Sequence, residues 1–236
     1  MRREHHSWIS SHLGRRMDFL WYGHWGPAVL IFPTSMGKYY ENEDQGLVGA
    51  LADKIDAGQL QVCCVDSVDA ESWYCRWAHP LGRAWRHHQY DQYLRWELIP
   101  YMLHRTHDWQ ITVFGASFGA YHAANIAARY PQLVRKAICF SGKYDIDAFV
   151  RGHWNETCYY HCPTAYIPNM DPEWSRHVDM TRWIIATGEY DHLAEESRKF
   201  SRMLHDKWIN NHLEIWPGQF GHDWPWWRQH LRRFLP

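Results

Sequence analysis

The chain has 236 residues and a formal net charge of −1, and this length predicts one domain with one main core. Its basic residues occur only in scattered short pairs, which argues against a nucleic-acid-binding surface, so we expect a small-molecule partner. No segment approaches the roughly eighteen apolar residues of a membrane span, and the first residues lack the apolar region of a signal peptide. We therefore expect a cytoplasmic protein without membrane contact; the sequence makes no prediction of oligomeric state.

The first quarter of the chain predicts a strand-helix-strand unit. Residues 17–22 and 28–32 have the composition of two strands joined by a Gly/Pro turn, the first of them an edge hairpin partner. The second is apolar throughout, as in a strand buried on both faces, and the loop 33–37 that ends it is a candidate functional loop. Helical spacing over 45–57 and an apolar run at 60–65 complete the unit.

The next segment leads to the centre of the chain. Residues 66–88 are aromatic and turn-rich without a clear period, which predicts a long loop over the sheet. Residues 89–104 have helical spacing, with Pro100 as a kink rather than an end. An apolar strand at 111–114 and a helix ending near residue 130 follow.

The second half continues the alternation of strands and helices. After a strand at 136–140, residues 145–180 suit short helical turns that cap the sheet and form a lid or pocket wall. The remaining predicted elements are a strand at 182–187, a helix at 193–208, a strand at 212–216 and a helix at 224–234. This alternation predicts a single α/β domain over residues 1–236, with a mostly parallel sheet and helices on both faces.

The pentapeptide Gly115-Ala116-Ser117-Phe118-Gly119 is a G-x-S-x-G between the central strand and its helix. In such a nucleophile elbow the serine lies on a strained turn, and the glycines let the strand and helix backbones approach closely. The pentapeptide alone occurs in many proteins, but the strand before it and the helix after it fit an elbow. Ser117 is therefore the candidate nucleophile.

A serine hydroxyl needs a neighbouring base, and the base needs an acid that holds its tautomer. Asp191 lies four residues beyond the strand end at Thr187, and His222 lies six beyond Trp216, in the order Ser, Asp, His. Asp191 could instead cap the helix that begins at 193, and His222 is one histidine among eighteen. Rivals that adjoin the histidine or follow a strand are Asp223, Asp145 and Ser141.

The negative charge of a tetrahedral intermediate requires hydrogen-bond donors, commonly two backbone N–H groups. Phe118, the residue after the nucleophile, is expected to supply one at the start of its helix. The other is expected from the loop 33–37, where either Ser35 or Met36 is positioned. The alternative is that this loop is only a turn.

With these motifs the chain resembles the esterase D-like group of α/β-hydrolases, which includes S-formylglutathione hydrolases and mycolyltransferase-type esterases. The resemblance covers most of the chain, and the matching segments are 72–74, 93–101, 115–119, 140–145, 188–191 and 221–227. It implies the α/β-hydrolase fold and cofactor-independent hydrolysis of carboxylic esters through an acyl-serine, with Ser117, Asp191 and His222 as the triad. Many relatives carry His-Gly after the oxyanion-loop strand, where this chain has Pro33-Thr34.

Two further hypotheses compete with ester hydrolysis. A thioesterase or an acyltransferase would use the same triad and differ in what enters or leaves the acyl-enzyme. A non-catalytic binding module on a hydrolase scaffold belongs to a different class. An intact set of three catalytic residues argues against the module.

The remaining candidate site residues are aromatic side chains and cysteines. Trp73, Tyr74, Tyr190 and Trp224 are candidates for lining an acyl or alcohol pocket, with packing alone as the alternative for each. Cys158, His161 and Cys162, with His153 upstream, have a spacing loosely like that of metal ligands, but a structural zinc site would need a second ligand pair, so we expect no metal. The six cysteines do not form a disulfide framework and are expected to be reduced, with Cys63 and Cys64 filling the two faces of a buried strand.

Overall fold

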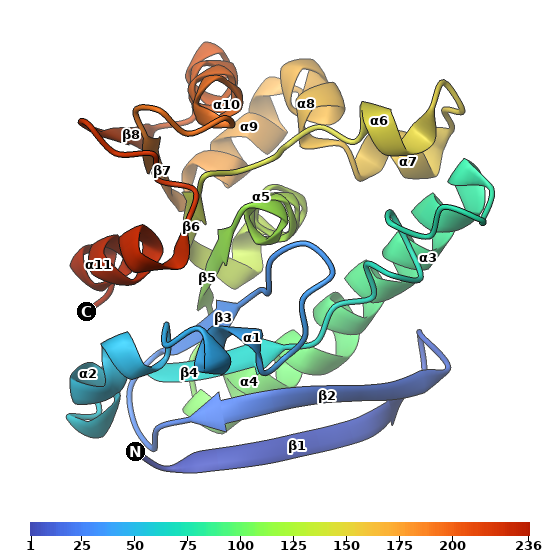
Figure 1. Cartoon of the computed structure of the whole chain (residues 1–236). Coiled ribbons are helices and arrows are strands. Elements are labelled where there is room, and N and C mark those ends of the chain that lie inside the picture. Colours follow the sequence, from blue (N-terminus) through green and yellow to red (C-terminus); the bar gives the residue numbers. More distant parts are fainter.

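The computed structural model describes all 236 residues and places eight strands in one sheet, in the order β1-β2-β4-β3-β5-β6-β7-β8 (Figure 1). The strands are β1 (Arg3–Ser10), β2 (Arg15–Tyr22), β3 (Ala28–Ile31), β4 (Gln61–Val65), β5 (Ile111–Ala116), β6 (Val134–Phe140), β7 (Arg182–Gly188) and β8 (Asn211–Trp216). The pairs β1–β2 and β2–β4 are antiparallel, and every other pair is parallel. This is the mostly parallel sheet that the sequence predicted.

Helices connect the parallel strands and cover both faces of the sheet (Figure 1). They are α1 (Glu41–Asp44), α2 (Ala52–Asp56), α3 (Pro80–Tyr93), α4 (Ile99–Thr106), α5 (Phe118–Arg129), α6 (Asp147–Val150), α7 (Glu156–Tyr160), α8 (Pro163–Tyr166), α9 (Pro172–Asp179), α10 (Ala194–Asp206) and α11 (Trp224–Phe234). Short 3-10 turns occupy Gly49–Leu51, Pro131–Leu133 and Ile167–Asn169. None of the helices combines the length and the apolar character that crossing a bilayer requires.

The two faces of the sheet bury separate apolar cores. One core contains side chains of α4, α5 and α10, and the other contains side chains of α2 and α11. Cys63 belongs to the first core and Cys64 to the second, because successive residues of a strand point to opposite faces. The predicted role of this cysteine pair is confirmed.

The N-terminal strands differ from the prediction. β2 is not an edge strand, because β1 pairs along its outer side with Arg3 opposite Tyr22, and β4 separates β2 from β3. The hairpin is therefore β1–β2 rather than β2–β3. β1 escaped prediction because most of its residues are polar, as an edge strand tolerates, so it carries little apolar alternation.

Two predicted helices also differ. α3 begins at Pro80 inside the expected loop, because proline suits the first turn of a helix and the His79 side chain accepts from the Leu81 N–H. Only residues 66–79 remain a loop. A π-helical turn over Leu94–Leu98 joins α3 to α4, and Pro100 lies in the first turn of α4. The helix expected at 45–57 is broken into short pieces, with Gly46 at a φ of 71° between α1 and the turn that follows.

The rest of the chain follows the predicted order. Between β6 and β7 the chain forms four short helices, α6 to α9, which lie beyond the end of the sheet near α5 (Figure 1). The carboxyl ends of β5, β7 and β8 lead directly into the segments that carry Ser117, Asp191 and His222. The parallel register of these strands brings the three segments to one edge of the sheet.

Candidate active site

Ser117 lies on a strained turn between β5 and α5, with φ 56° and ψ −121°. A non-glycine residue adopts such backbone angles only where its surroundings enforce them. The two neighbouring glycines permit the turn: a Cβ on Gly115 would lie 2.0 Å from the carbonyl oxygen of Gly119, and a Cβ on Gly119 would lie 2.5 Å from that of Pro33. Ser117 thus stands at the head of α5, next to the N–H of Phe118.

The structure brings Ser117, His222 and Asp191 into one hydrogen-bonded chain. The Nε2 atom of His222 lies 3.1 Å from Ser117 Oγ. Its Nδ1 atom lies 3.1 Å and 3.3 Å from the two carboxylate oxygens of Asp191. The three residues come from the ends of β5, β7 and β8, in the chain order that the sequence predicted.

Asp191 is held as an ionised, buried carboxylate. Its burial by itself would raise the pKa, but hydrogen bonds, led by the one from His222, outweigh burial and hold the pKa of Asp191 below its ordinary value. The backbone N–H of Leu193 also donates to Asp191 Oδ1 over 2.8 Å. Asp191 therefore accepts a backbone hydrogen bond just before α10 and contacts His222 at the same time, so the two roles considered from the sequence are compatible.

The rival residues have other partners. Ser141 is fully buried; its hydroxyl donates to the carbonyl of Gly221 over 3.0 Å and accepts from Trp227 Nε1 over 3.1 Å, so it fixes the backbone next to His222. Asp223 caps α11 by accepting from the Trp224 N–H over 2.7 Å. Asp145 accepts hydrogen bonds from within the 145–180 segment.

The loop 33–37 is anchored by two carboxylates on either side of Ser35. Glu41 accepts from the Thr34 N–H over 2.7 Å, and Asp69 accepts from the Met36 N–H over 3.0 Å. No protein group accepts from the N–H of Ser35. Of the two predicted donors in this loop, Met36 is committed to Asp69 and Ser35 retains an unused N–H.

Ser35, Ser117 and His222 face the same open depression, which has a volume of about 240 Å³. Its lining residues are Thr34, Ser35, Ser117, His222, Asp223, Trp224 and Trp227. The depression is small and open, so it offers access to the serine but only a limited binding wall.

The four aromatic residues predicted to line a pocket occupy different environments. Trp73 is fully buried and donates from Nε1 to the Tyr121 hydroxyl, so it contributes packing rather than a surface for substrate. Tyr74 is half-buried and donates to Ser35 Oγ over 2.9 Å. Tyr190 is exposed next to Asp191, and Trp224 borders the depression.

Sequence reasoning missed the residues that hold the loop 33–37. Asp69 is buried and pairs with His122 of α5, whose Nε2 lies 3.0 Å from Asp69 Oδ1, so it links the loop to the helix behind the nucleophile. Its place a few residues beyond the carboxyl end of β4 is a signal that could have identified it. Glu41 carries no comparable signal, because only the fold brings α1 against the loop.

Two groups of side chains in the structure could hold a metal ion. The combination of Cys158, His161 and Cys162, whose spacing the sequence analysis weighed and set aside, is not one of them: Cys158 Sγ contacts the carbonyl of His153 and Cys162 Sγ contacts Thr164. The two groups are His88, Asp91 and His161, and Asp191, His192 and His222.

The chain matches a family model described as "Putative esterase" over residues 40–236. It belongs to this esterase family. The protein is therefore a hydrolase of the carboxylesterase type. The first three strands, β1, β2 and β3, precede the matched part. No curated protein matches the chain.

Solved structures of esterases and hydrolases share the fold. A ferulic acid esterase superposes with a TM-score of 0.80 at 14% identity, covering 100% of this chain and 96% of its own. The S-formylglutathione hydrolase from Agrobacterium tumefaciens gives 0.71 at 14% identity, covering 98% and 93%. The fluorophosphonate-binding serine hydrolase F of Staphylococcus aureus gives 0.70 at 16% identity, covering 99% and 96%. Together with the sheet order, these matches establish the α/β-hydrolase fold.

Proposed function

We propose that the esterase cleaves small carboxylic esters through an acyl-serine intermediate, with Ser117 as nucleophile, His222 as general base and Asp191 as the acid that orients it. The observation that carries this proposal is the continuous hydrogen-bonded chain from Ser117 Oγ through His222 to Asp191. The buried, ionised Asp191 supports it, because a carboxylate there holds the proton on His222 Nδ1 and leaves Nε2 free to accept.

The reaction then follows from the positions of these atoms. His222 Nε2 takes the hydroxyl proton while Ser117 Oγ bonds to the carbonyl carbon, and the carbonyl π electrons move onto its oxygen. The tetrahedral intermediate collapses when the bond to the alcohol oxygen breaks and that oxygen takes the proton from His222. Water repeats the two steps on the acyl-serine and releases the acid.

The backbone N–H groups of Phe118 and Ser35 are proposed to bind the oxygen that becomes negative. Phe118 begins α5, so its N–H has no partner within the helix, and the helix dipole favours negative charge there. Ser35 is favoured over Met36 because the Met36 N–H is occupied by Asp69. Tyr74 supports this loop by its hydrogen bond to the Ser35 side chain.

The substrate is proposed to lie against the open depression, with Trp224 and Tyr190 beside its acyl or alcohol part. One of the fold relatives is described as a ferulic acid esterase and another as an S-formylglutathione hydrolase, so both an aryl ester and a thioester are reasonable test substrates. The same triad serves either. The ratio of kcat/KM for an ester and its matched thioester decides which class the enzyme prefers.

The test of the serine mechanism combines a covalent probe with turnover. A fluorophosphonate should label wild-type protein once, at Ser117, and p-nitrophenyl acetate should be hydrolysed. Ser117→Ala should abolish both, while the exposed Ser7→Ala should leave both unchanged. Labelling at a different serine, or full turnover by Ser117→Ala, would contradict the proposal.

The test of the acid uses two isosteric variants. Asp191→Asn should lower kcat by roughly 10⁴-fold, because an amide stabilises the wrong tautomer of His222. Asp145→Asn changes the rival acid and should keep kcat within a few-fold of wild type. A reversal of these two results would move the acid to Asp145.

A further inference from the structure

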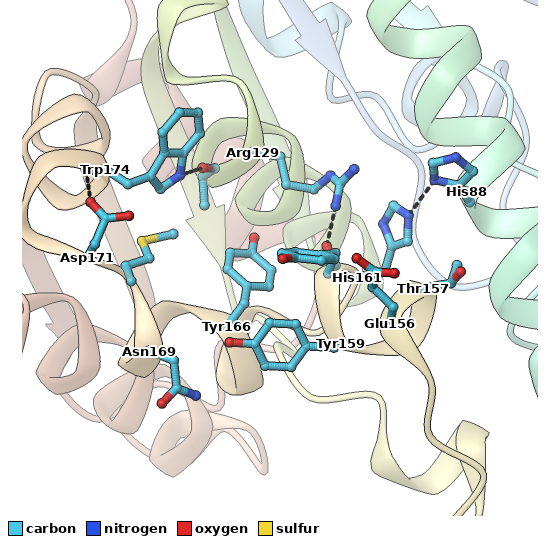
Figure 2. A pocket seen from close by; sticks show the side chains of 13 residues that line it. His88, Arg129, Glu156, Thr157, Tyr159, His161, Tyr166, Asn169, Asp171 and Trp174 are labelled. Carbon is cyan, nitrogen blue, oxygen red and sulfur yellow. Dashed lines mark hydrogen bonds between the residues drawn. The ribbon is translucent and has the colours of Figure 1, made fainter.

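A second and larger cavity, of about 560 Å³, lies away from Ser117. Figure 2 shows it between the short helices of the 145–180 segment and the far end of α5, where Ala128 and Arg129 form part of its wall. α5 separates it from the nucleophile, since Phe118 and Arg129 at its two ends are about 16 Å apart along the axis. A volume of this size suits a small ligand, and the proposed ester hydrolysis does not use it.

Two histidines on the wall of this cavity face each other. His88 Nδ1 and His161 Nε2 are 3.1 Å apart, and both residues line the cavity (Figure 2). His88 lies on α3 and His161 at the end of α7. Asp91 lies one turn beyond His88 on the same face of α3, since residues three apart are neighbours on a helix. Ligand atoms of all three residues lie within 4.8 Å of one another.

The carboxylate of Asp91 uses one oxygen and leaves the other without a hydrogen bond. Its Oδ2 accepts from the Tyr130 hydroxyl over 2.6 Å and from Arg129 and Gln92 over 3.3 Å. Its Oδ1 is buried and accepts no hydrogen bond, although Asp91 is only 2% exposed. Arg129 Nε lies 3.3 Å from Oδ1, but it too has no hydrogen-bond partner because its N–H is not directed at that oxygen. A buried carboxylate oxygen without a donor is costly unless a further ligand satisfies it.

We propose that His88, Asp91 and His161 bind a divalent transition-metal ion, with its remaining coordination positions open to the cavity. Two imidazole nitrogens with one carboxylate oxygen suit Zn²⁺, Co²⁺ or Ni²⁺ better than Ca²⁺ or Mg²⁺, which prefer oxygen ligands. With metal–nitrogen bonds of about 2.1 Å, the spacing of the two nitrogens corresponds to an angle of about 95° at the ion. That angle is closer to octahedral than to tetrahedral coordination, which leaves room for water or a small ligand from the cavity.

Neighbouring residues hold two of the three proposed ligands, as residues around metal sites do. Hydrogen bonds from Arg129 and Tyr130 hold Asp91 through Oδ2, and Oδ1, which accepts none, is the oxygen proposed to bind the metal beside the Arg129 guanidinium. The amide nitrogen of Asn125 lies 3.1 Å from His161 Nδ1, and the amide oxygen accepts from the Tyr166 hydroxyl. Metal binding at Nε2 requires the ring proton of His161 on Nδ1, and a rotation of the Asn125 amide presents its oxygen to accept that proton.

The test measures binding of ZnCl₂ and CoCl₂ to the whole protein by calorimetry and by the temperature of thermal unfolding. The control variant is His192→Gln, which removes the other candidate group beside the triad. Wild type and His192→Gln should each bind one ion per chain and unfold at a higher temperature with metal. His88→Gln and Asp91→Asn should bind at least about tenfold more weakly and lose this shift. Loss of binding in His192→Gln with retention in His88→Gln, or no binding to wild type, would overturn the proposal.

A measurement on wild-type protein removes any dependence on how the variants fold. Paramagnetic Co²⁺ shifts the NMR signals of nearby nuclei and thereby locates the ion. The largest shifts should come from α3 and α7, with smaller ones around His222. Shifts centred on His222, or shifts without a centre, would show that the three residues form only a buried hydrogen-bond network.

Discussion

At the scale of single residues, the strained turn at Ser117 depends on two glycines that have no room for a side chain. The sequence identified this pentapeptide because a strand precedes it and a helix follows it. It could not show how tight the packing is, since the carbonyl of Pro33 that meets Gly119 belongs to a segment 86 positions earlier in the chain.

Gly115→Ala tests this tightness. The new Cβ would lie 2.0 Å from the Gly119 carbonyl oxygen, so the turn must open, and we expect a loss of about 3 kcal/mol or more in the free energy of unfolding. Gly82→Ala is the matched control: it lies in α3 with nothing within 4 Å, and the change should stabilise the protein by up to about 1 kcal/mol. Urea denaturation of both variants checks the two signs; equal effects would contradict the packing argument.

Glu41 allows a pH-dependent prediction. Burial raises the pKa of Glu41 above its ordinary value, and the hydrogen bonds from Thr34 offset this only in part. Glu41 therefore contributes its whole stabilisation at a pH below the pKa that it has in the unfolded chain. This contribution is lost as the pH rises through the higher pKa that Glu41 has in the folded protein. Glu41→Gln keeps an acceptor for the Thr34 N–H and removes this loss. The free energy of unfolding of Glu41→Gln, measured by denaturation relative to wild type, should increase from about pH 4 to about pH 7. A difference that stays constant or falls over this range would contradict the raised pKa of Glu41.

At the scale of elements, the loop 33–37, which we propose to supply an oxyanion donor, is held from outside its own segment. Asp69 connects the Met36 N–H to His122 of α5, so the loop and the helix behind the nucleophile share one buried carboxylate. The sequence placed a functional loop at 33–37 but left Ser35 and Met36 as alternatives. The choice depends on Asp69, which lies 33 residues beyond Met36.

Asp69→Ala should lower kcat roughly 10- to 100-fold with little change in KM, because a misplaced loop weakens transition-state binding more than substrate binding. Asp69→Asn retains one acceptor oxygen and should restore most of the activity. Tyr74→Phe removes only the contact to the Ser35 side chain and should cost less than Asp69→Ala. Steady-state kinetics give kcat and KM for each variant, and circular dichroism checks that each is folded. A folded Asp69→Ala variant with wild-type kcat would contradict the proposed role of Asp69 in holding the loop 33–37.

Other elements show where local patterns fail. The edge strand β1 is polar on most of its residues, so its pairing with β2 rather than its own composition makes it a strand. The start of α3 was expected at residue 89 rather than at Pro80, and this put His88 in a loop and Asp91 in a helix. For that reason the sequence could not place His88 and Asp91 on one helical face, or find His161 opposite them.

At the scale of the whole molecule, all six cysteines are buried, and none forms a disulfide. Burial raises the pKa of the Cys64 and Cys139 thiols well above its ordinary value, so neither forms the reactive thiolate near neutral pH. Ellman's reagent should therefore react with no thiol in the native protein and with six after denaturation. Rapid reaction of a native thiol would show that one part of the core opens locally.

The sequence alone determined the α/β alternation and the order of Ser117, Asp191 and His222 along the chain, because these depend on local periodicity and on motifs of a few residues. The tertiary structure decided which backbone N–H of the loop 33–37 is unused, where the N-terminal hairpin pairs, and that His88, Asp91 and His161 meet beside a cavity. Each of these depends on contacts between distant segments, such as Met36 with Asp69, and a local pattern carries no record of such contacts.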